Sequence, residues 1–129
     1  MKKVLVFGTF DLLHEGHVSF LEQASRMGDM LIASVSRDAF VKNWKGKTPL
    51  NPEGARLRRL LDSGLVSRAC LSDQKPGTYE IIRRVKPELI CLGYDQDELK
   101  EDLKAWMEEQ GIEIPIHRMK YHPPEKTTP

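Results

Sequence analysis

Ten residues near the N-terminus, residues 8–17, constrain the fold of this chain more than any other stretch. They read Gly-Thr-Phe-Asp-Leu-Leu-His-Glu-Gly-His and follow an apolar run at residues 4–7. That run is consecutive, contains β-branched and aromatic residues and is closed by a glycine, which predicts a buried strand. From Glu15 to Met27 apolar residues recur about every three positions, which predicts a helix. The ten residues are therefore a strand-to-helix junction.

A junction of this kind at the carboxyl end of a parallel strand is suited to bind an anion, because backbone N–H groups and the positive end of a helix dipole meet there. His14 and His17 lie on the opening turn, and Gly16 beside them leaves room for a ligand to approach the backbone. A zinc pair is an alternative, but neither cysteine has ligand spacing with these histidines. Two polar surface histidines are a further alternative. The neighbouring Thr9 and Asp11 favour the anion site.

Composition predicts one soluble domain, residues 1–129, with a proline-rich polar tail at residues 123–129 that we expect to be mobile. Twenty Lys plus Arg face nineteen Asp plus Glu, so the formal net charge of +1 argues against a global field for nucleic acid or an acidic membrane. Cys70 and Cys91 fall in predicted strands without framework spacing, which favours a reducing, cytoplasmic location. No apolar run has the length of a signal peptide core or a membrane span.

Apolar runs and helical periodicity alternate along the rest of the chain. Strands are predicted at residues 30–35, 69–71 and 89–92, with an edge-like last strand where the isoleucines of residues 112–116 alternate with polar residues. Helices are predicted between them. This alternation predicts an α/β fold with a Rossmann-like, doubly wound parallel sheet of five strands and right-handed crossovers.

The predicted strand order, 3-2-1-4-5, also predicts where a ligand binds. The winding direction reverses between the first and fourth strands, and ligands of such sheets bind outside the carboxyl ends at this switch point. Residues 8–17 follow the first of these strands, and residues 93–96 follow the fourth. Topology and the ten-residue motif therefore select the same crevice.

Three lysines form a second candidate feature. A short helix is predicted at residues 36–41, and a glycine and nearby prolines predict a loop at residues 42–47. Lys42, Lys45 and Lys47 in this loop are candidates for phosphate contacts. The alternative is an ordinary solvated face, since lysine is mostly exposed.

Residues 8–17 resemble the signature of the cytidylyltransferase-like nucleotidyltransferases, which reads Gly-Thr-Phe-Asp, two variable residues and His-x-Gly-His. The resemblance implies an enzyme that joins a nucleoside triphosphate to a small acceptor and releases pyrophosphate. It implies that His14 and His17 are catalytic and stabilise charge at the α-phosphate. It also implies catalytic roles for Lys42 and for Arg118, which would hold the phosphates.

The resemblance further implies a nucleotide-binding set drawn from separate segments of the chain. Backbone N–H groups of the motif would bind phosphate, its aspartate would order the turn, the Gly-x-Asp element would hold base and ribose, and the tail threonines would close over the phosphates. The set comprises Gly8, Thr9, Phe10, Asp11, Gly16, Lys45, Arg56, Gly93, Tyr94, Asp95, Thr127 and Thr128.

The resemblance leaves the substrates open. The main interpretation is transfer from CTP or ATP to a small phosphorylated acceptor, as in glycerol-3-phosphate cytidylyltransferases. These enzymes, however, carry a second acid and a tryptophan where residues 93–96 read Gly-Tyr-Asp-Gln. The alternative is an archaeal FAD synthase, an enzyme that adenylylates FMN. This chain resembles those enzymes more closely in that loop and in the elements Lys-Gly-Lys-x-Pro and Pro-Glu-x-x-Arg. A nucleotide-binding module without turnover is a second alternative, because the family continues with a helix beyond the position of Pro129.

Choline- or ethanolamine-type phosphates and phosphopantetheine also fit as acceptors. The resemblance implies Mg²⁺ held mainly by the triphosphate, with no metal site on the protein, because a tetraanion is hard to bind without a cation. It also implies a homodimer.

Overall fold

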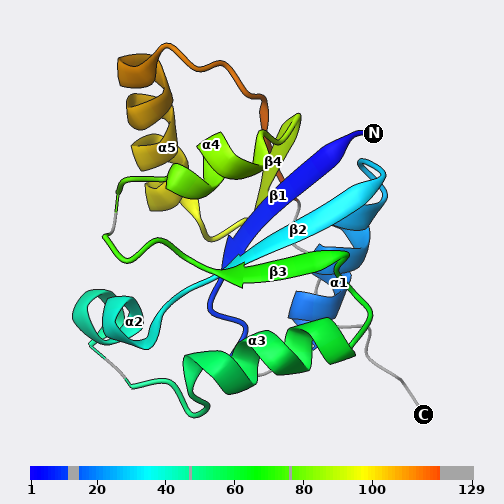
Figure 1. Cartoon of the computed structure of the whole chain (residues 1–129), viewed down its shortest axis with the longest axis vertical. Helices are drawn as coiled ribbons and strands as arrows, with labels where there is room; N and C mark the ends of the chain where they lie inside the picture. The colour runs from blue at the N-terminus through cyan, green and yellow to red at the C-terminus, as the bar shows by residue number, and fades with distance from the viewer. Residues whose placement is uncertain (12–14, 47, 76, 120–129) are drawn as a thin grey trace.

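The computed structural model describes residues 1–11, 15–46, 48–75 and 77–119, which fold into a five-stranded parallel sheet flanked by helices (Figure 1). The strand order is β3-β2-β1-β4-β5, as predicted. The strands are β1 (Lys3–Gly8), β2 (Met30–Val35), β3 (Arg68–Leu71), β4 (Leu89–Leu92) and β5 (Ile116–Arg118). The helices are α1 (Glu15–Ser25), α2 (Asp38–Lys45), α3 (Glu53–Asp62), α4 (Glu80–Val85) and α5 (Asp97–Gln110).

Each face of the sheet carries its own apolar core, because successive side chains of a strand point to opposite faces. Val4 and Val6 of β1 pack in the cluster that α1 and α3 cover. Leu5, between them, packs in the cluster that α4 and α5 cover. Burial on both faces explains why β1 is a continuous apolar run in the sequence. No helix among the described ranges is both long and apolar enough to cross a membrane.

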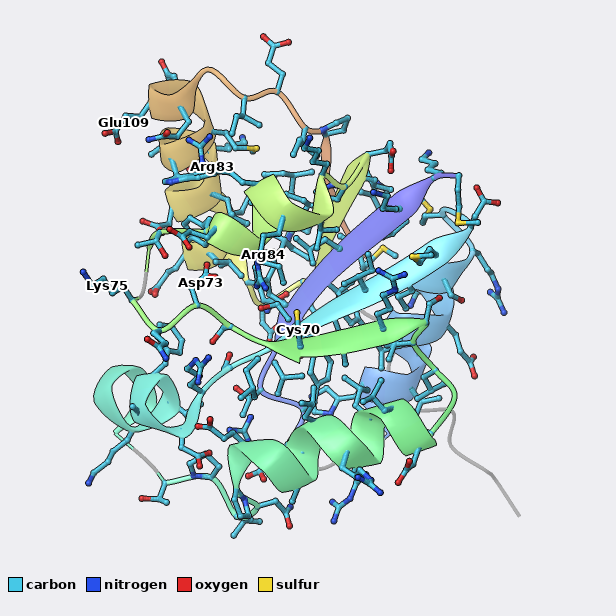
Figure 2. All side chains as sticks on the ribbon, in the orientation of Figure 1. Cys70, Asp73, Lys75, Arg83, Arg84 and Glu109 are labelled. Carbon is cyan, nitrogen blue, oxygen red and sulfur yellow. The ribbon has the colours of Figure 1, made fainter. Side chains whose placement is uncertain are left out.

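Both cysteines lie in strands, as predicted, and neither forms a disulfide. Burial raises the pKa of Cys91 to about 11. Burial also raises the pKa of Cys70, although the charge of Arg84 on α4 opposes this shift (Figure 2). A thiol with a raised pKa is a poor nucleophile. The two cysteines therefore act as small apolar side chains.

The prediction of a loop at residues 42–47 was wrong in part, because α2 continues to Lys45. The helix ends where Gly46 adopts the left-handed conformation, φ 66°, and its N–H donates to the carbonyl of Lys42. A left-handed glycine is a common helix stop. The stop signal is therefore this glycine, and the prolines further along do not shorten the helix. Lys47 lies outside the described residues.

The predicted last strand was also displaced. The isoleucines of residues 112–116 predicted the strand, but β5 runs from Ile116 to Arg118, where it pairs with β4. Residues 112–114 lie beyond the amino end of β4 and have no register partner there, and the carbonyl of Pro115 accepts from the N–H of Ile90 at 3.0 Å. Ile112 and Ile114 pack instead against the core under α4 and α5. The alternation of isoleucines with polar residues therefore reflects packing against this core.

Candidate active site

The candidate site lies at the carboxyl ends of β1 and β4, which are neighbours in the sheet. The chain leaving β1 leads to α1 on one face, and the chain leaving β4 leads to α5 on the other. Figure 1 shows both strand ends pointing to the same edge of the sheet, with α2 beyond it. We call residues 7–11 the β1 junction and residues 93–96 the β4 junction. The predicted switch point is confirmed.

Phe10 gives the β1 junction its shape. Its backbone is in the left-handed region, φ 51°, and the residue is only 2% exposed. The ring folds back over Gly8, where an added Cβ would lie 2.7 Å from ring carbons, so only glycine fits. The ring of His17, on the first turns of α1, meets the Phe10 ring edge to face with centroids 5.7 Å apart. His17 is thus held beside the junction.

Four carbonyl groups of the β1 junction accept hydrogen bonds from other segments of the chain. Their acceptor oxygens and donors are Phe7 O from Gln96 Nε2 (3.0 Å), Gly8 O from Ser36 N (2.9 Å), Thr9 O from Arg56 Nη1 (2.7 Å) and Asp11 O from Asn51 Nδ2 (3.0 Å). A carbonyl oxygen repels a phosphate, so an anion site built from backbone needs its carbonyls directed elsewhere. Four of the five carbonyls of the junction meet this requirement.

The carboxylate of Asp11 fixes the loop that precedes α3. Its two oxygens accept hydrogen bonds from the backbone N–H groups of Leu50 (2.8 Å) and Asn51 (2.9 Å). Partial burial opposes its ionisation, but these hydrogen bonds outweigh that effect and lower the pKa of Asp11. The predicted ordering role of Asp11 therefore takes the form of a contact with a distant loop.

Arg56 is the most buried charged side chain near the site, with a side-chain exposure of 0%. Its Nε donates to the carbonyl of Asn51 at 3.0 Å and its Nη1 to that of Thr9. Its Nη2 pairs with Asp38 Oδ1 at 2.6 Å. A buried charge is tolerated when it is paired and hydrogen-bonded in this way. Arg56 holds the β1 junction through the carbonyl of Thr9. Its predicted contact with nucleotide stays a prediction.

The helices α2 and α3 exchange caps at their N-termini. The carboxylate of Glu53 accepts from the N–H of Asp38 at 2.9 Å, and the carboxylate of Asp38 accepts from the N–H of Glu53 at 3.2 Å. Carboxylates are favourable at helix N-termini, where N–H groups lack partners. Lys42 lies one turn further along α2 and is exposed. The position of Lys42 is therefore tied, through Asp38 and Arg56, to the β1 junction.

At the β4 junction, Gln96 Oε1 accepts from the N–H of Gly93 at 2.8 Å. Tyr94 is 46% exposed, and its backbone carbonyl accepts from Arg118 Nη2 at 2.6 Å. Arg118 also pairs with Asp97 Oδ1 at 3.1 Å. The structure thus places Arg118 beside the β4 junction, at the crevice where it was predicted.

The structure brings together the predicted residues of the two junctions, Arg56, His17, Lys42 and Arg118 on one edge of the sheet. His14, Thr127, Thr128 and the predicted tail at residues 123–129 lie outside the described residues, as does the side chain of Lys45.

Sequence reasoning missed the residues that hold the junctions in place: Asp38, Asn51, Glu53 and Gln96. Asp38 and Glu53 had a signal, because acidic residues are frequent at helix starts. No local sequence pattern marked Gln96 or Asn51.

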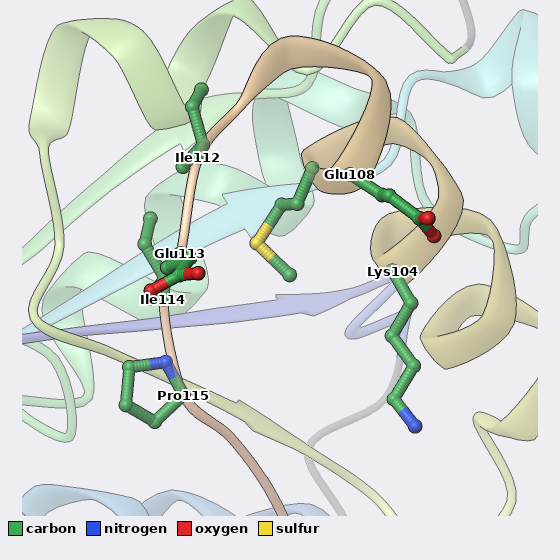
Figure 3. Close-up of a pocket in the computed structure, with 7 residues that line it drawn as sticks. Lys104, Glu108, Ile112, Glu113, Ile114 and Pro115 are labelled. Carbon is green, nitrogen blue, oxygen red and sulfur yellow. The ribbon is translucent and has the colours of Figure 1, made fainter.

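A shallow pocket also exists at the other end of α5, on the amino-end side of the sheet (Figure 3). Its lining includes Met107, Ile112, Ile114 and Pro115. It contains none of the predicted site residues. Among the residues that the structure describes, no group of three or more His, Cys, Asp or Glu could hold a metal ion.

Comparisons with known proteins agree with this fold. A family model described as cytidylyltransferase-like matches residues 5–128. A FAD synthase of Pyrococcus horikoshii is 40% identical over 121 residues, covering 92% of this chain and 80% of that protein. A FAD synthase of Ferroglobus placidus is 40% identical over 120 residues, covering 93% and 77%. A crystal structure of a lipopolysaccharide core biosynthesis protein from Thermoplasma volcanium is 33% identical with a TM-score of 0.87, covering 95% of this chain and 99% of that one.

Proposed function

The chain belongs to the cytidylyltransferase-like family of nucleotidyltransferases, and we propose that it is an FMN adenylyltransferase that makes FAD from ATP and FMN. The similarity to FAD synthases, 40% identity over 92% of the chain, carries this proposal. It favours the alternative drawn from the sequence over the main interpretation, a glycerol-3-phosphate cytidylyltransferase. Residues 93–96, which lack the second acid and the tryptophan of those enzymes, support the same choice.

The proposed reaction is a direct displacement at phosphorus. A phosphate oxygen of FMN attacks the α-phosphorus of ATP and forms a new P–O bond. The bond from the α-phosphorus to the oxygen that bridges to the β-phosphorus breaks, and pyrophosphate leaves with that electron pair. No covalent enzyme intermediate is needed, so the protein has to align the two phosphates and offset their charge.

The described residues suit these two tasks. The β1 junction and the start of α1 would hold the triphosphate, because four of the five junction carbonyls are engaged by other segments. His17 would donate to the α-phosphate as negative charge develops, with His14 as its partner. Lys42 and Arg118 would approach the β- and γ-phosphates from α2 and β5. The β4 junction would hold the adenosine.

Mg²⁺ is expected to accompany the triphosphate, because a bare tetraanion is costly to bind. The carboxylate of Asp11 is occupied by the Leu50 and Asn51 amides, so it is engaged in structure and poorly placed to hold the ion. The residues present therefore fit an ion that the phosphate oxygens hold. Such an ion would lower the negative charge that the protein must neutralise. The homodimer and the cytoplasmic location stay predictions.

Product formation over a matrix of nucleotides and acceptors tests the proposed function. The four common nucleoside triphosphates are each combined with FMN, glycerol 3-phosphate, phosphocholine, phosphoethanolamine and phosphopantetheine, and pyrophosphate release is measured. We expect turnover with ATP and FMN, with FAD identified by chromatography. Turnover only with CTP and glycerol 3-phosphate would restore the main interpretation. Nucleotide binding without turnover in any combination would support the binding-module alternative.

Lys42 should contribute to nucleotide binding through a partly solvated charge contact. We expect Lys42→Ala to weaken ATP binding by roughly five- to tenfold, which corresponds to about 1 kcal/mol. Wild-type affinity should also fall with added salt, because such contacts are screened. Calorimetric titration at several salt concentrations measures both effects.

Lys104→Ala is the matched control, because Lys104 is an exposed lysine on a helix that borders the distant pocket. It should leave the affinity for ATP unchanged. Equal affinity of both variants and the wild-type chain, with no dependence on salt, would favour the solvated-face interpretation of the lysines.

A further inference from the structure

We propose that Gln96 is a positioning residue for nucleotidyl transfer, which locks the β1 junction to the β4 junction and keeps the carbonyl of Phe7 away from the phosphates. This role rests on the proposed function in one respect, namely that the crevice binds the phosphates of a nucleotide. It assigns no direct contact between Gln96 and substrate.

The side-chain amide of Gln96 uses both of its ends. Oε1 accepts from the N–H of Gly93 at 2.8 Å, and Nε2 donates to the carbonyl of Phe7 at 3.0 Å. Because one end must accept and the other must donate, the two contacts fix the orientation of the amide. A single planar group thus spans the ends of two neighbouring parallel strands.

The position of Gln96 in the chain gives no other reason for a glutamine. It is the residue before α5, where asparagine, aspartate, serine, threonine and glycine are preferred because their short side chains cap the helix. Its side chain makes no capping hydrogen bond. The side chain extends away from the helix to the strand ends. Its main interactions are therefore the hydrogen bonds to Gly93 and Phe7, which we call the Gln96 bridge.

The Gln96 bridge differs from the other contacts of the β1 junction in the side from which it comes. Of the four donors that hold the carbonyls of the β1 junction, Ser36, Asn51 and Arg56 come from the β2 and α3 side, and Gln96 comes from the β4 side. Loss of the Gln96 contact would release the Phe7 carbonyl and separate the phosphate region from the adenosine region. In-line transfer is sensitive to displacements of about 1 Å.

Two substitutions separate the parts of this role. Gln96→Glu keeps the length of the side chain and the acceptor for Gly93, but it loses the donor to Phe7 and adds a negative charge. Gln96→Met keeps a similar volume and loses both hydrogen bonds without adding charge. Gln110→Glu and Gln110→Met are matched controls, because Gln110 ends the same helix and contacts Arg83 far from the crevice.

The experiment measures the binding of inorganic pyrophosphate by calorimetry, together with kcat and both KM values for ATP and FMN. We expect each Gln96 variant to bind pyrophosphate about tenfold more weakly and to lose about ten- to a hundredfold in kcat. KM for FMN and the melting temperature should stay close to wild type, which a merely structural role would not give. The Gln110 variants should match wild type throughout.

Wild-type pyrophosphate affinity and kcat in both Gln96 variants would overturn the positioning role. A loss confined to Gln96→Glu would also overturn it, because added charge alone would then explain the effect. Pyrophosphate binding that follows the expected pattern in a chain inactive with FMN would support the positioning role and reject the proposed acceptor. A wild-type chain that binds neither pyrophosphate nor any nucleotide would overturn both.

Discussion

Replacing His17 by alanine should lower kcat by about two to three orders of magnitude, because one donor to the developing charge is worth roughly 3 to 4 kcal/mol in a preorganised site. The melting temperature should change little, since His17 is only partly buried and an edge-to-face ring contact such as that with Phe10 contributes about 1 kcal/mol. The resemblance implies the same loss for His14→Ala. Steady-state kinetics with ATP and FMN and a thermal melt measure the two effects.

His117→Ala is the control for this loss. His117 is an exposed histidine of β5, and it neighbours Arg118 but points to the opposite face of the strand. Its removal should leave kcat within about twofold of wild type. Wild-type kcat in a folded His17→Ala variant would remove that histidine from the mechanism.

Replacing Asp38 by alanine should lower the free energy of unfolding by about 3 kcal/mol and the melting temperature by about 10 °C. The substitution leaves the buried guanidinium of Arg56 without its charge partner, and it removes the cap from the N–H of Glu53. The lower end of the range for buried pairs is expected, because the Asp38 side chain is 39% exposed. Urea and thermal unfolding measure the change.

Asp62→Ala provides the comparison, because Asp62 pairs with Arg58 at 3.9 Å on the exposed face of α3. An exposed pair of this kind contributes less than about 1 kcal/mol. If Asp38→Ala costs no more than Asp62→Ala, the buried network between α2, α3 and the β1 junction does not stabilise the fold.

The central strands were predictable from sequence because a parallel sheet with helices on both faces buries them. The predicted strand at residues 30–35 coincides with β2, and that at residues 89–92 coincides with β4. Residues 89–92 are a consecutive apolar run, and residues 30–35 are apolar except for Ser34. The displaced strand at residues 112–116 shows the limit of this signal, because alternating isoleucines also fit a segment that packs on a helix without a partner strand.

The contacts that shape the site were not predictable, because they join residues far apart in the sequence. Arg56 and Thr9 are separated by 47 positions, and Gln96 and Phe7 by 89. No local propensity marks such pairs. The crevice could be predicted because the motif and the topology select the same strand ends. The ten-residue motif serves the whole family and does not choose the substrates, so the proposal of ATP and FMN rests on residues 93–96 and on the similarity to FAD synthases.

The fate of the phosphates in a single turnover tests the proposed function most directly. The chain is mixed in excess with FMN and ATP that carries radioactive phosphorus in either the α or the γ position. We predict that the α label appears in FAD and the γ label in pyrophosphate. Transfer of the γ label to the flavin, or a flavin that stays unlabelled with both forms of ATP, would contradict adenylyl transfer to FMN.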